Sequence, residues 1–414
     1  MSGLALRSLG NRRFTVLLTL LSVALSVALL LGVERIRIET RSAFVRSVAG
    51  TDLIIGARAH PVQLLLYSVF RVGDATNNLD YASFKEIAAR PDVAWAVPIS
   101  LGDSHRGFRV LGTSTDYFEH VGFSDDRRLE FQAGRPFGDL YDAVLGADVA
   151  RDLGYATASR IVLAHGTARV STSLHDDQPF IVSGVLARTG TPADQSVYVS
   201  LEAIEAIHRN WRGGTRVART PTAPLPAELV PTTITAAFIG LKSRSSAFGL
   251  QRQINEYRGE PLTAILPGVA LSQLWSILGS VERALLATAA CVVAAALMVL
   301  LTSVAATLNE RRREMAILRA VGAAPRHIFA LLLMEALALS VGGVLAGYAL
   351  LEIALGVFAP LIESRYGLYL PGRLPTTDEV ILLAGIAAGG LMVGLVPAFI
   401  AYRRSIADGM NVTL

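Results

Sequence analysis

Charged residues gather in one short segment between two long apolar runs, and this segment is the strongest candidate for chemistry in the chain. Residues 310–327 read ERRREMAILRAVGAAPRH. Met315 and Leu318 recur at helical spacing, while Arg312 and Arg319 share the opposite face. The pattern is typical of an amphipathic helix at a membrane surface rather than of a span. Its arginines can pair with acidic groups of a partner protein or with anionic lipid headgroups.

Two carboxylates form the second candidate, because they interrupt the apolar run that follows. Glu335 and Glu352 both lie inside it. An ionisable side chain within a span marks a functional position by default. We favour a polar contact between helices for Glu335 over a proton or ion relay. Glu352 has the same two readings and is expected nearer the outer interface.

The histidines and hydroxyl residues give no recognisable metal or catalytic motif. His165 and the stretch His175-Asp-Asp invite a metal-site interpretation, but no His-x-x-x-His or Cys/His pair supplies ligand spacing. No G-x-S-x-G nucleophile motif occurs either. We therefore expect no catalytic, metal-binding or cofactor-binding residues, and a protein that is not an enzyme.

The elements that carry these residues are membrane spans. The chain is 52% hydrophobic and 17% charged, with a mean hydropathy of +0.46, which is too apolar for an ordinary soluble domain. A bilayer core needs roughly 20 apolar residues as a helix. Four segments meet this requirement. They are residues 14–33, 281–308, 328–361 and 380–402.

Arginines beside the spans predict the orientation. They precede the first span, crowd the loop at 309–327 and follow the fourth span, and the excess of such residues marks cytoplasmic segments. Residues 1–13, 309–327 and the tail 403–414 are therefore expected in the cytoplasm, and 362–379 in a short external loop. Arg35 and three further arginines follow the first span on the outer side, where Glu34 and Glu39 interleave them as on a solvated helix.

The first apolar run has two interpretations. A cleavable signal peptide is the alternative to a membrane anchor, but the run exceeds the usual length of roughly 7 to 15 residues and no small-x-small site closes it. We predict an uncleaved anchor.

The long segment between the first two spans, residues 34–280, is predicted to be an exported α+β domain. Short β-rich runs alternate in it with helical ones, separated by Gly, Pro and Asp turn signals. We expect two lobes, with the distal one inserted at about residues 100–230. The single cysteine, Cys291, falls in the second span, so this domain contains no disulfide. A net charge of only +4, concentrated at membrane flanks, argues against nucleic acid as a partner.

Several blocks together resemble one family of membrane proteins. ERRREMAILRAVGAAPRHI and the following LLLMEA resemble the segment between the second and third spans of MacB/FtsX/LolC permeases, the type VII or mechanotransmission ABC transporters. RPDVAWAVP, VLGTSTDYFE, AGRPF, AVLGADVARDLG and PFIVSGVLA resemble, in order, blocks of the family's periplasmic core domain. The arrangement of one span followed by three fits as well.

The resemblance implies a permease subunit that works as a dimer above an ATP-binding protein. No G-x-x-x-x-G-K-[ST] phosphate loop occurs in the chain, so ATP is expected to bind to a separate ABC ATP-binding protein. Contact with that ATPase would fall on the 310–327 segment. The residues implicated are Glu310, Arg311, Arg312, Arg313, Glu314, Met315, Ile317, Leu318, Arg319 and Gly322.

Three functions follow from these patterns. The first is a permease of the cytoplasmic membrane that exports or extracts a substrate from the periplasm or outer leaflet. The second is an FtsX-like regulator that switches a cell-wall or periplasmic partner without transport. The third, a static receptor, would leave the basic segment unexplained. The second permease copy is either identical or homologous, and a periplasmic binding protein or lipoprotein is a further possible partner. The sequence does not select a substrate.

Overall fold

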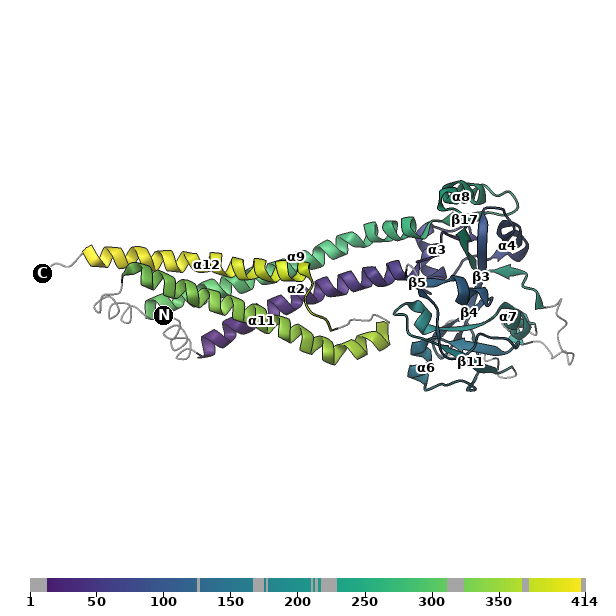
Figure 1. Cartoon of the computed structure of the whole chain (residues 1–414), viewed down its shortest axis with the longest axis horizontal. Coiled ribbons are helices and arrows are strands. Elements are labelled where there is room, and N and C mark those ends of the chain that lie inside the picture. Colours follow the sequence, from purple (N-terminus) through teal and green to yellow (C-terminus); the bar gives the residue numbers. More distant parts are fainter. Residues whose placement is uncertain are drawn as a thin grey trace. The chain divides into compact units, whose positions relative to one another are not determined.

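A computed structural model gives the fold of the chain. It describes residues 13–124, 127–166, 175, 178–209, 211–212, 215–216, 229–310, 324–366 and 372–410. The chain divides into a helical unit and a mixed α/β unit (Figure 1). The helical unit contains residues up to 38 together with 279–361 and everything from 370 onward, whereas the α/β unit contains 39–278 and 362–369.

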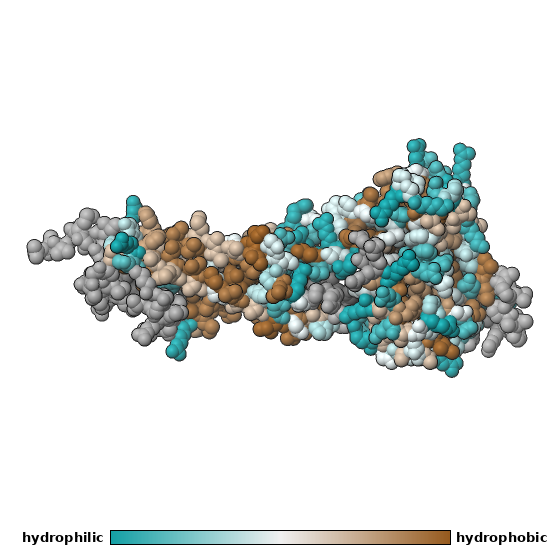
Figure 2. Space-filling model, in the orientation of Figure 1, coloured by the Kyte–Doolittle hydropathy of each residue, from teal (hydrophilic) through white to brown (hydrophobic). Residues whose placement is uncertain are grey.

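Four long helices make up most of the helical unit. They are α2 (Arg13–Ser47), α9 (Pro267–Glu310), α11 (Pro325–Tyr366) and α12 (Thr377–Met410). Each contains an apolar window long enough to cross a membrane. Leucine, isoleucine, valine and phenylalanine side chains on their outer surfaces are exposed, and Figure 2 shows them as a brown band. A helix that is apolar on all sides suits lipid, because lipid gives its outer face an apolar surrounding. Each of the four predicted spans lies within one of these helices.

Small residues let these helices approach closely. Gly343 and Gly347 of α11 face α2, and a Cβ atom at Gly347 would lie 2.6 Å from the carbonyl oxygen of Ala24. On α12, Gly394 packs against Ala336 of α11. These three glycines therefore allow close packing of helices within one chain, as small residues at helix interfaces in membranes generally do. Among the described residues, buried side chains cluster around Leu300 and Ala336 and around Ile328 and Ala398.

The α/β unit is built on one 11-stranded mixed sheet, with strand order β17-β1-β16-β3-β4-β12-β8-β11-β7, in which β10 pairs with β3 and β9 with β11. Most neighbours are antiparallel, whereas the pairs β12/β4 and β11/β8 are parallel. The strands of this sheet are β1 (Leu53–Ala57), β3 (Val93–His105), β4 (Phe108–Thr113), β7 (Phe131–Gly134), β8 (Asp142–Leu145), β9 (Arg160–Ile161), β10 (Ala164–His165), β11 (Phe180–Leu186), β12 (Ser196–Ser200), β16 (Ala236–Leu241) and β17 (Leu262–Ile265).

Among the described residues, three two-stranded pairs and eight short helical segments accompany this sheet. The pairs are β2 (Leu79–Asp80) with β15 (Thr233–Ile234), β5 (Gly122–Ser124) with β6 (Arg127–Arg128), and β13 (Trp211–Arg212) with β14 (Thr215–Arg216). The helical segments are α3 (Pro61–Ser68), α4 (Tyr81–Ala88), α5 (Asp116–His120), α6 (Ala147–Leu153), α7 (Leu201–His208), α8 (Ala247–Asn255), η1 (Pro192–Gln195) and η3 (Arg244–Ser246).

At β1 both faces of the sheet are covered, so this strand is apolar without a break. Successive strand residues point to opposite faces. In β1, Ile54 joins the cluster on one face, with residues of α3 and α5, while Leu53 and Ile55 join the other face, with residues of α4 and α8. Farther along the sheet, Val197 and Val199 of β12 pack in one cluster with residues of α6 and α7. This explains the buried run LIIGA.

The boundary between the two units falls inside α2 and inside α9, since each helix contributes residues to both units without interruption. Within the α/β unit, the last part of α2 and the first part of α9 meet. Phe44 stacks on Phe70 with ring centroids 4.2 Å apart and lies edge-on to Trp275 at 5.4 Å. Aromatic contacts of this kind add about 0.5–1.5 kcal/mol each beyond burial of their area. The two helix ends are thus anchored to one aromatic cluster.

The α+β class and the arrangement of one helix followed by three agree with the sequence analysis. The helices extend beyond the predicted spans, most clearly α2, which continues to Ser47. Strands from the predicted distal range, about 100–230, join strands from outside it in the same sheet. The division into two lobes stays a prediction.

Candidate functional site

The predicted contact segment lies largely outside the described residues. Glu310 is the last residue of α9, and α11 begins at Pro325. The start of α11 is capped by His327, whose Nδ1 accepts a hydrogen bond from the Ala324 amide at 3.1 Å. The assignments that fall outside the described residues are those of Arg311, Arg312, Arg313, Glu314, Met315, Ile317, Leu318, Arg319 and Gly322.

Glu352 is one member of a charged cluster that joins three helices of the bundle. The guanidinium of Arg35 on α2 donates to Glu352 on α11 at 2.7 Å and to Glu379 on α12 at 2.9 Å. Arg35 is only 2% exposed and Glu379 only 1%. A charge removed from water this completely is tolerated only when it is paired and hydrogen-bonded. The cluster therefore fixes α2, α11 and α12 against one another.

Local structure orients this cluster. Glu379 lies in the first turn of α12, and the residues from Thr376 to Glu379 form a capping box. The Thr376 amide donates to Glu379 Oε2 at 2.9 Å, and the Glu379 amide donates to Thr376 Oγ1 at 3.4 Å. Arg373 lies 3.6 Å from the same carboxylate, and its carbonyl accepts a hydrogen bond from Tyr348 Oη at 2.9 Å. These contacts help to orient the carboxylate that Arg35 binds.

The prediction that Arg35 lies on a solvated helix face is wrong. The sequence around it mixes arginine with glutamate, which indicated solvent exposure, yet its partners come from residues more than 300 positions away. Arg37, two residues on, does follow the predicted pattern, since it pairs with Glu34 in a partly exposed i, i+3 contact at 2.5 Å. A capping-box pattern at Thr376 was the available signal for Glu379.

Glu335 is buried within α11. The neighbouring Ala336 contributes to the core of the helical unit and lies against Gly394 of α12. Glu335 therefore lies in the region where α11 and α12 pack. Its predicted role as a polar contact between helices, rather than in ion relay, stays a prediction.

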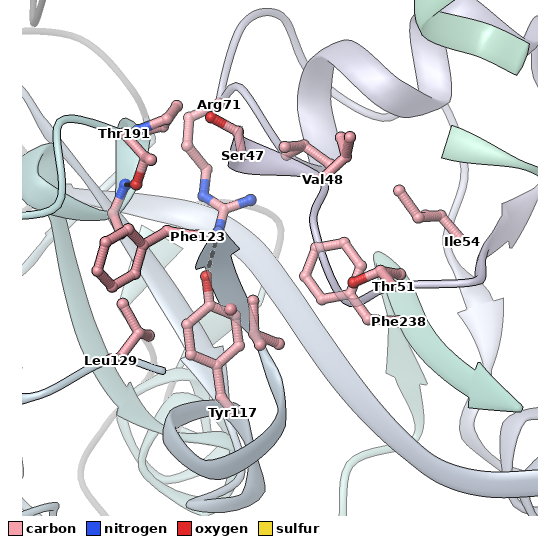
Figure 3. A pocket seen from close by; sticks show the side chains of 15 residues that line it. Ser47, Val48, Thr51, Ile54, Arg71, Tyr117, Phe123, Leu129, Thr191 and Phe238 are labelled. Atoms are coloured by element: carbon pink, nitrogen blue, oxygen red, sulfur yellow. Dashed lines mark hydrogen bonds between the residues drawn. The ribbon is translucent and has the colours of Figure 1, made fainter. Parts of the chain in front are cut away.

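A pocket in the α/β unit presents a guanidinium (Figure 3). Arg71 Nη2 donates to Tyr117 Oη at 3.3 Å, while its Nε and Nη1 are buried without an acceptor among the described residues. Apolar side chains such as Phe123 and Phe238 form much of the wall. The pocket thus combines donors suited to an anionic oxygen with an apolar surrounding.

One wall of this pocket is a loop organised by a buried carboxylate. Asp194 accepts hydrogen bonds from the Thr189 amide at 2.9 Å, from Thr189 Oγ1 at 2.8 Å and from the Gly190 amide at 2.6 Å. Burial raises the pKa of Asp194 above its ordinary value, and these hydrogen bonds only partly oppose that effect. The carboxylate fixes the turn that places Thr191 and Ala193 at the pocket.

Comparison with protein families accounts for nearly the whole chain. Residues 16–256 match the MacB-like periplasmic core domain, and residues 286–408 match the FtsX-like permease C-terminal domain. The first match by itself covers more than half of the 414 residues. The chain belongs to the MacB/FtsX-type permease family. It is therefore a multi-pass membrane protein of the permease class whose α/β unit is the extracytoplasmic domain of that family.

Two solved structures are similar to the extracytoplasmic domain of this permease. The periplasmic region of MacB from Actinobacillus actinomycetemcomitans is 12% identical, with a TM-score of 0.35, and the match covers 56% of this chain and 95% of that one. The extracellular domain of the noncanonic ABC-type transporter YknZ from Gram-positive bacteria is 13% identical, with a TM-score of 0.30, covering 52% and 99%. No curated protein matches the chain.

Proposed function

We propose that this permease is the membrane subunit of an ABC transporter and that ATP is hydrolysed by a separate ABC ATP-binding protein. ATP-driven closure of that partner would move the helical bundle, and the bundle would move the extracytoplasmic domain. The movement would export or extract a substrate from the periplasm or the outer leaflet. The chain itself would bind no ATP and catalyse no reaction.

The observation that carries this proposal is the continuity of α2 and α9. Each helix contains residues of both units, with no loop at the boundary. A helix with intact backbone hydrogen bonds transmits displacement along its axis, whereas a flexible linker would absorb it. The aromatic cluster of Phe44, Phe70 and Trp275 joins the two helix ends inside the domain. Movement of either helix would thus reach the domain core.

The orientation proposed for the chain follows the arginine distribution. Both termini and the 309–327 loop would face the cytoplasm, and the α/β unit would face the periplasm or the cell exterior. The 309–327 loop connects α9 with α11. A cytoplasmic ATPase could therefore bind this loop on the proposed cytoplasmic side of the membrane. A second permease copy, identical or homologous, would complete the complex, and a periplasmic binding protein or lipoprotein would be a further partner.

Affinity purification of the tagged full-length chain in mild detergent tests the proposal. We expect an ABC ATP-binding protein to copurify and the complex to hydrolyse ATP. A double charge reversal, Arg312→Glu with Arg313→Glu, is expected to reduce recovery of the ATPase, because these arginines would face its acidic groups. The matched control is Arg403→Glu with Arg404→Glu, which changes the charge beside the fourth span by the same amount.

Four outcomes have distinct meanings. Loss of the ATPase in the first variant but not in the control supports docking on the 309–327 loop. Equal recovery from both variants contradicts that assignment and leaves the arginines as determinants of topology. A copurifying cell-wall hydrolase, with ATPase present and no transported species, would favour the FtsX-like regulator instead. Absence of any ATPase would contradict the transporter proposal as a whole.

A further inference from the structure

Four side chains that are far apart in sequence converge in the extracytoplasmic domain. Asp103 lies on β3, His165 on β10 and His208 at the end of α7, and His175 completes the group. One ligand atom from each of the four residues lies within 4.8 Å of the other three. The local spacing of these histidines gave no sign of a site, because the sheet rather than the sequence brings them together.

The backbone positions these residues firmly. Asp103 and His165 are directly opposite one another in the antiparallel pairing of β3 with β10. The Gly166 amide donates to the Gly102 carbonyl at 3.0 Å, and the His175 amide donates to the Leu163 carbonyl at 2.9 Å. Pairs directly opposite in antiparallel strands hold their Cβ atoms about 5 Å apart. Two of the four ligands are therefore preset by strand register.

Three of the ligand atoms form a triangle whose sides suit a tetrahedral metal ion. His165 Nδ1 lies 3.1 Å from His208 Nε2, and each of these nitrogens lies 3.3 Å from Asp103 Oδ1. Zinc binds histidine nitrogen and carboxylate oxygen at about 2.0–2.2 Å, so the edges of its coordination tetrahedron measure about 3.4 Å. The ring centroid of His175 lies 5.3 Å from that of His208, and a ligand atom of His175 lies within 4.8 Å of the other three. It would supply the fourth corner.

Hydrogen bonding orients His208 toward this centre. Its Nδ1 lies 2.9 Å from the Ile204 carbonyl oxygen, and because that oxygen can only accept, Nδ1 must donate. The lone pair of neutral His208 is then on Nε2, the atom that faces Asp103. In metal-binding histidines, the ring nitrogen that does not bind the metal usually donates such a hydrogen bond, for example to a backbone carbonyl.

We propose that Asp103, His165, His175 and His208 form a binding site for one zinc ion in the extracytoplasmic domain. Imidazole nitrogen and carboxylate oxygen are both among the ligands that zinc binds in proteins. Four protein ligands leave no open coordination position, so the ion would be a resident structural one rather than a catalytic one. It would tie β3, β10 and the end of α7 together. His165, 44% exposed, gives the ion a path from solvent.

Zinc binding to the full-length chain tests this site directly. The protein would carry a streptavidin-binding tag rather than a histidine tag, and would be stripped with chelator and dialysed against Zn²⁺ in detergent. We expect one zinc ion per chain by elemental analysis, and a tetrahedral absorption spectrum when Co²⁺ replaces it. The variant His165→Gln with His208→Gln should bind zinc at least about 100-fold more weakly, since even loss of outer partners of a ligand weakens binding by 10- to 100-fold.

The matched control is His120→Gln, which alters a histidine of the same domain that stacks on Trp95 instead. It should retain one zinc ion. Tryptophan fluorescence in chelator reports whether each variant is folded, and a zinc-dependent rise of the wild-type unfolding temperature provides a readout that needs no variant. A wild-type chain without bound zinc, or equal zinc in the double variant and the control, would overturn the proposal.

Discussion

Arg35 is expected to be a main determinant of the stability of the helical bundle, although it lies at the edge of an ordinary basic and acidic stretch. Its guanidinium joins Glu352 and Glu379, so that one side chain links three helices. The informative perturbation is Arg35→Gln, which removes the charge and keeps a polar side chain. Arg37→Gln is the matched control, because Arg37 lies on the same helix and pairs with Glu34 in a partly exposed contact.

The expected magnitude follows from what the substitution leaves behind. Without Arg35, the carboxylate of Glu379 stays buried with only Arg373, at 3.6 Å, and the capping hydrogen bonds. Removing one partner of a buried ion pair costs about 3–5 kcal/mol. Since Arg373 compensates in part, we expect a loss near 3 kcal/mol for Arg35→Gln. The exposed pair of Arg37 is expected to contribute about 0.5 kcal/mol or less.

Unfolding of the full chain in mixed micelles, followed by loss of helical circular dichroism at increasing SDS, measures these free energies. A double-mutant cycle with Glu379→Gln isolates the pair, and a coupling energy of at least about 1 kcal/mol is expected for residues in one ionic network. The reasoning is refuted if Arg35→Gln is no more destabilising than Arg37→Gln. Strict additivity in the cycle would refute the pairing itself.

Two further predictions concern helix packing and pH. Gly347→Ala should destabilise the bundle by about 1–3 kcal/mol, because its Cβ would lie 2.6 Å from the backbone oxygen of Ala24. The matched change Gly385→Ala, which has open space around it, should be neutral or slightly stabilising. Equal effects of the two changes in the same SDS titration would contradict the close approach of the helices at Gly347. Burial raises the folded-state pKa of Asp194, so its contribution to the free energy of unfolding should fall as pH rises from the ordinary value near 3.8 through the folded pKa. The difference between wild type and Asp194→Asn, measured by tryptophan fluorescence, should therefore shrink over that pH range, and growth of the difference would show the opposite shift.

Much of the architecture could be predicted because it rests on local patterns. Apolar runs long enough for a bilayer must become helices, since only a helix satisfies all backbone groups within one segment. Runs such as LIIGA and SVYVS are strands because β-branched and apolar residues suit a covered sheet. The alternation of these runs with short helices indicated the α+β class. Each of these inferences needs only residues that are close together along the chain.

The candidate sites could be predicted only in part, because their partners are distant in sequence. Glu352 stood out as a charge in an apolar run, but its partner Arg35 resembled an ordinary surface arginine. Strand order was equally hidden, since β1 pairs with β16 and β17 from the far end of the domain.

The sequence by itself determined that this chain crosses a membrane through apolar helices, carries an α+β domain between the first and second, and belongs with permeases. Tertiary structure alone decided which charges are buried together and which histidines meet Asp103. The physical reason is that a helix or strand is selected by free energies of neighbouring residues, whereas an ion pair or ligand set depends on strand register and helix packing across the whole chain.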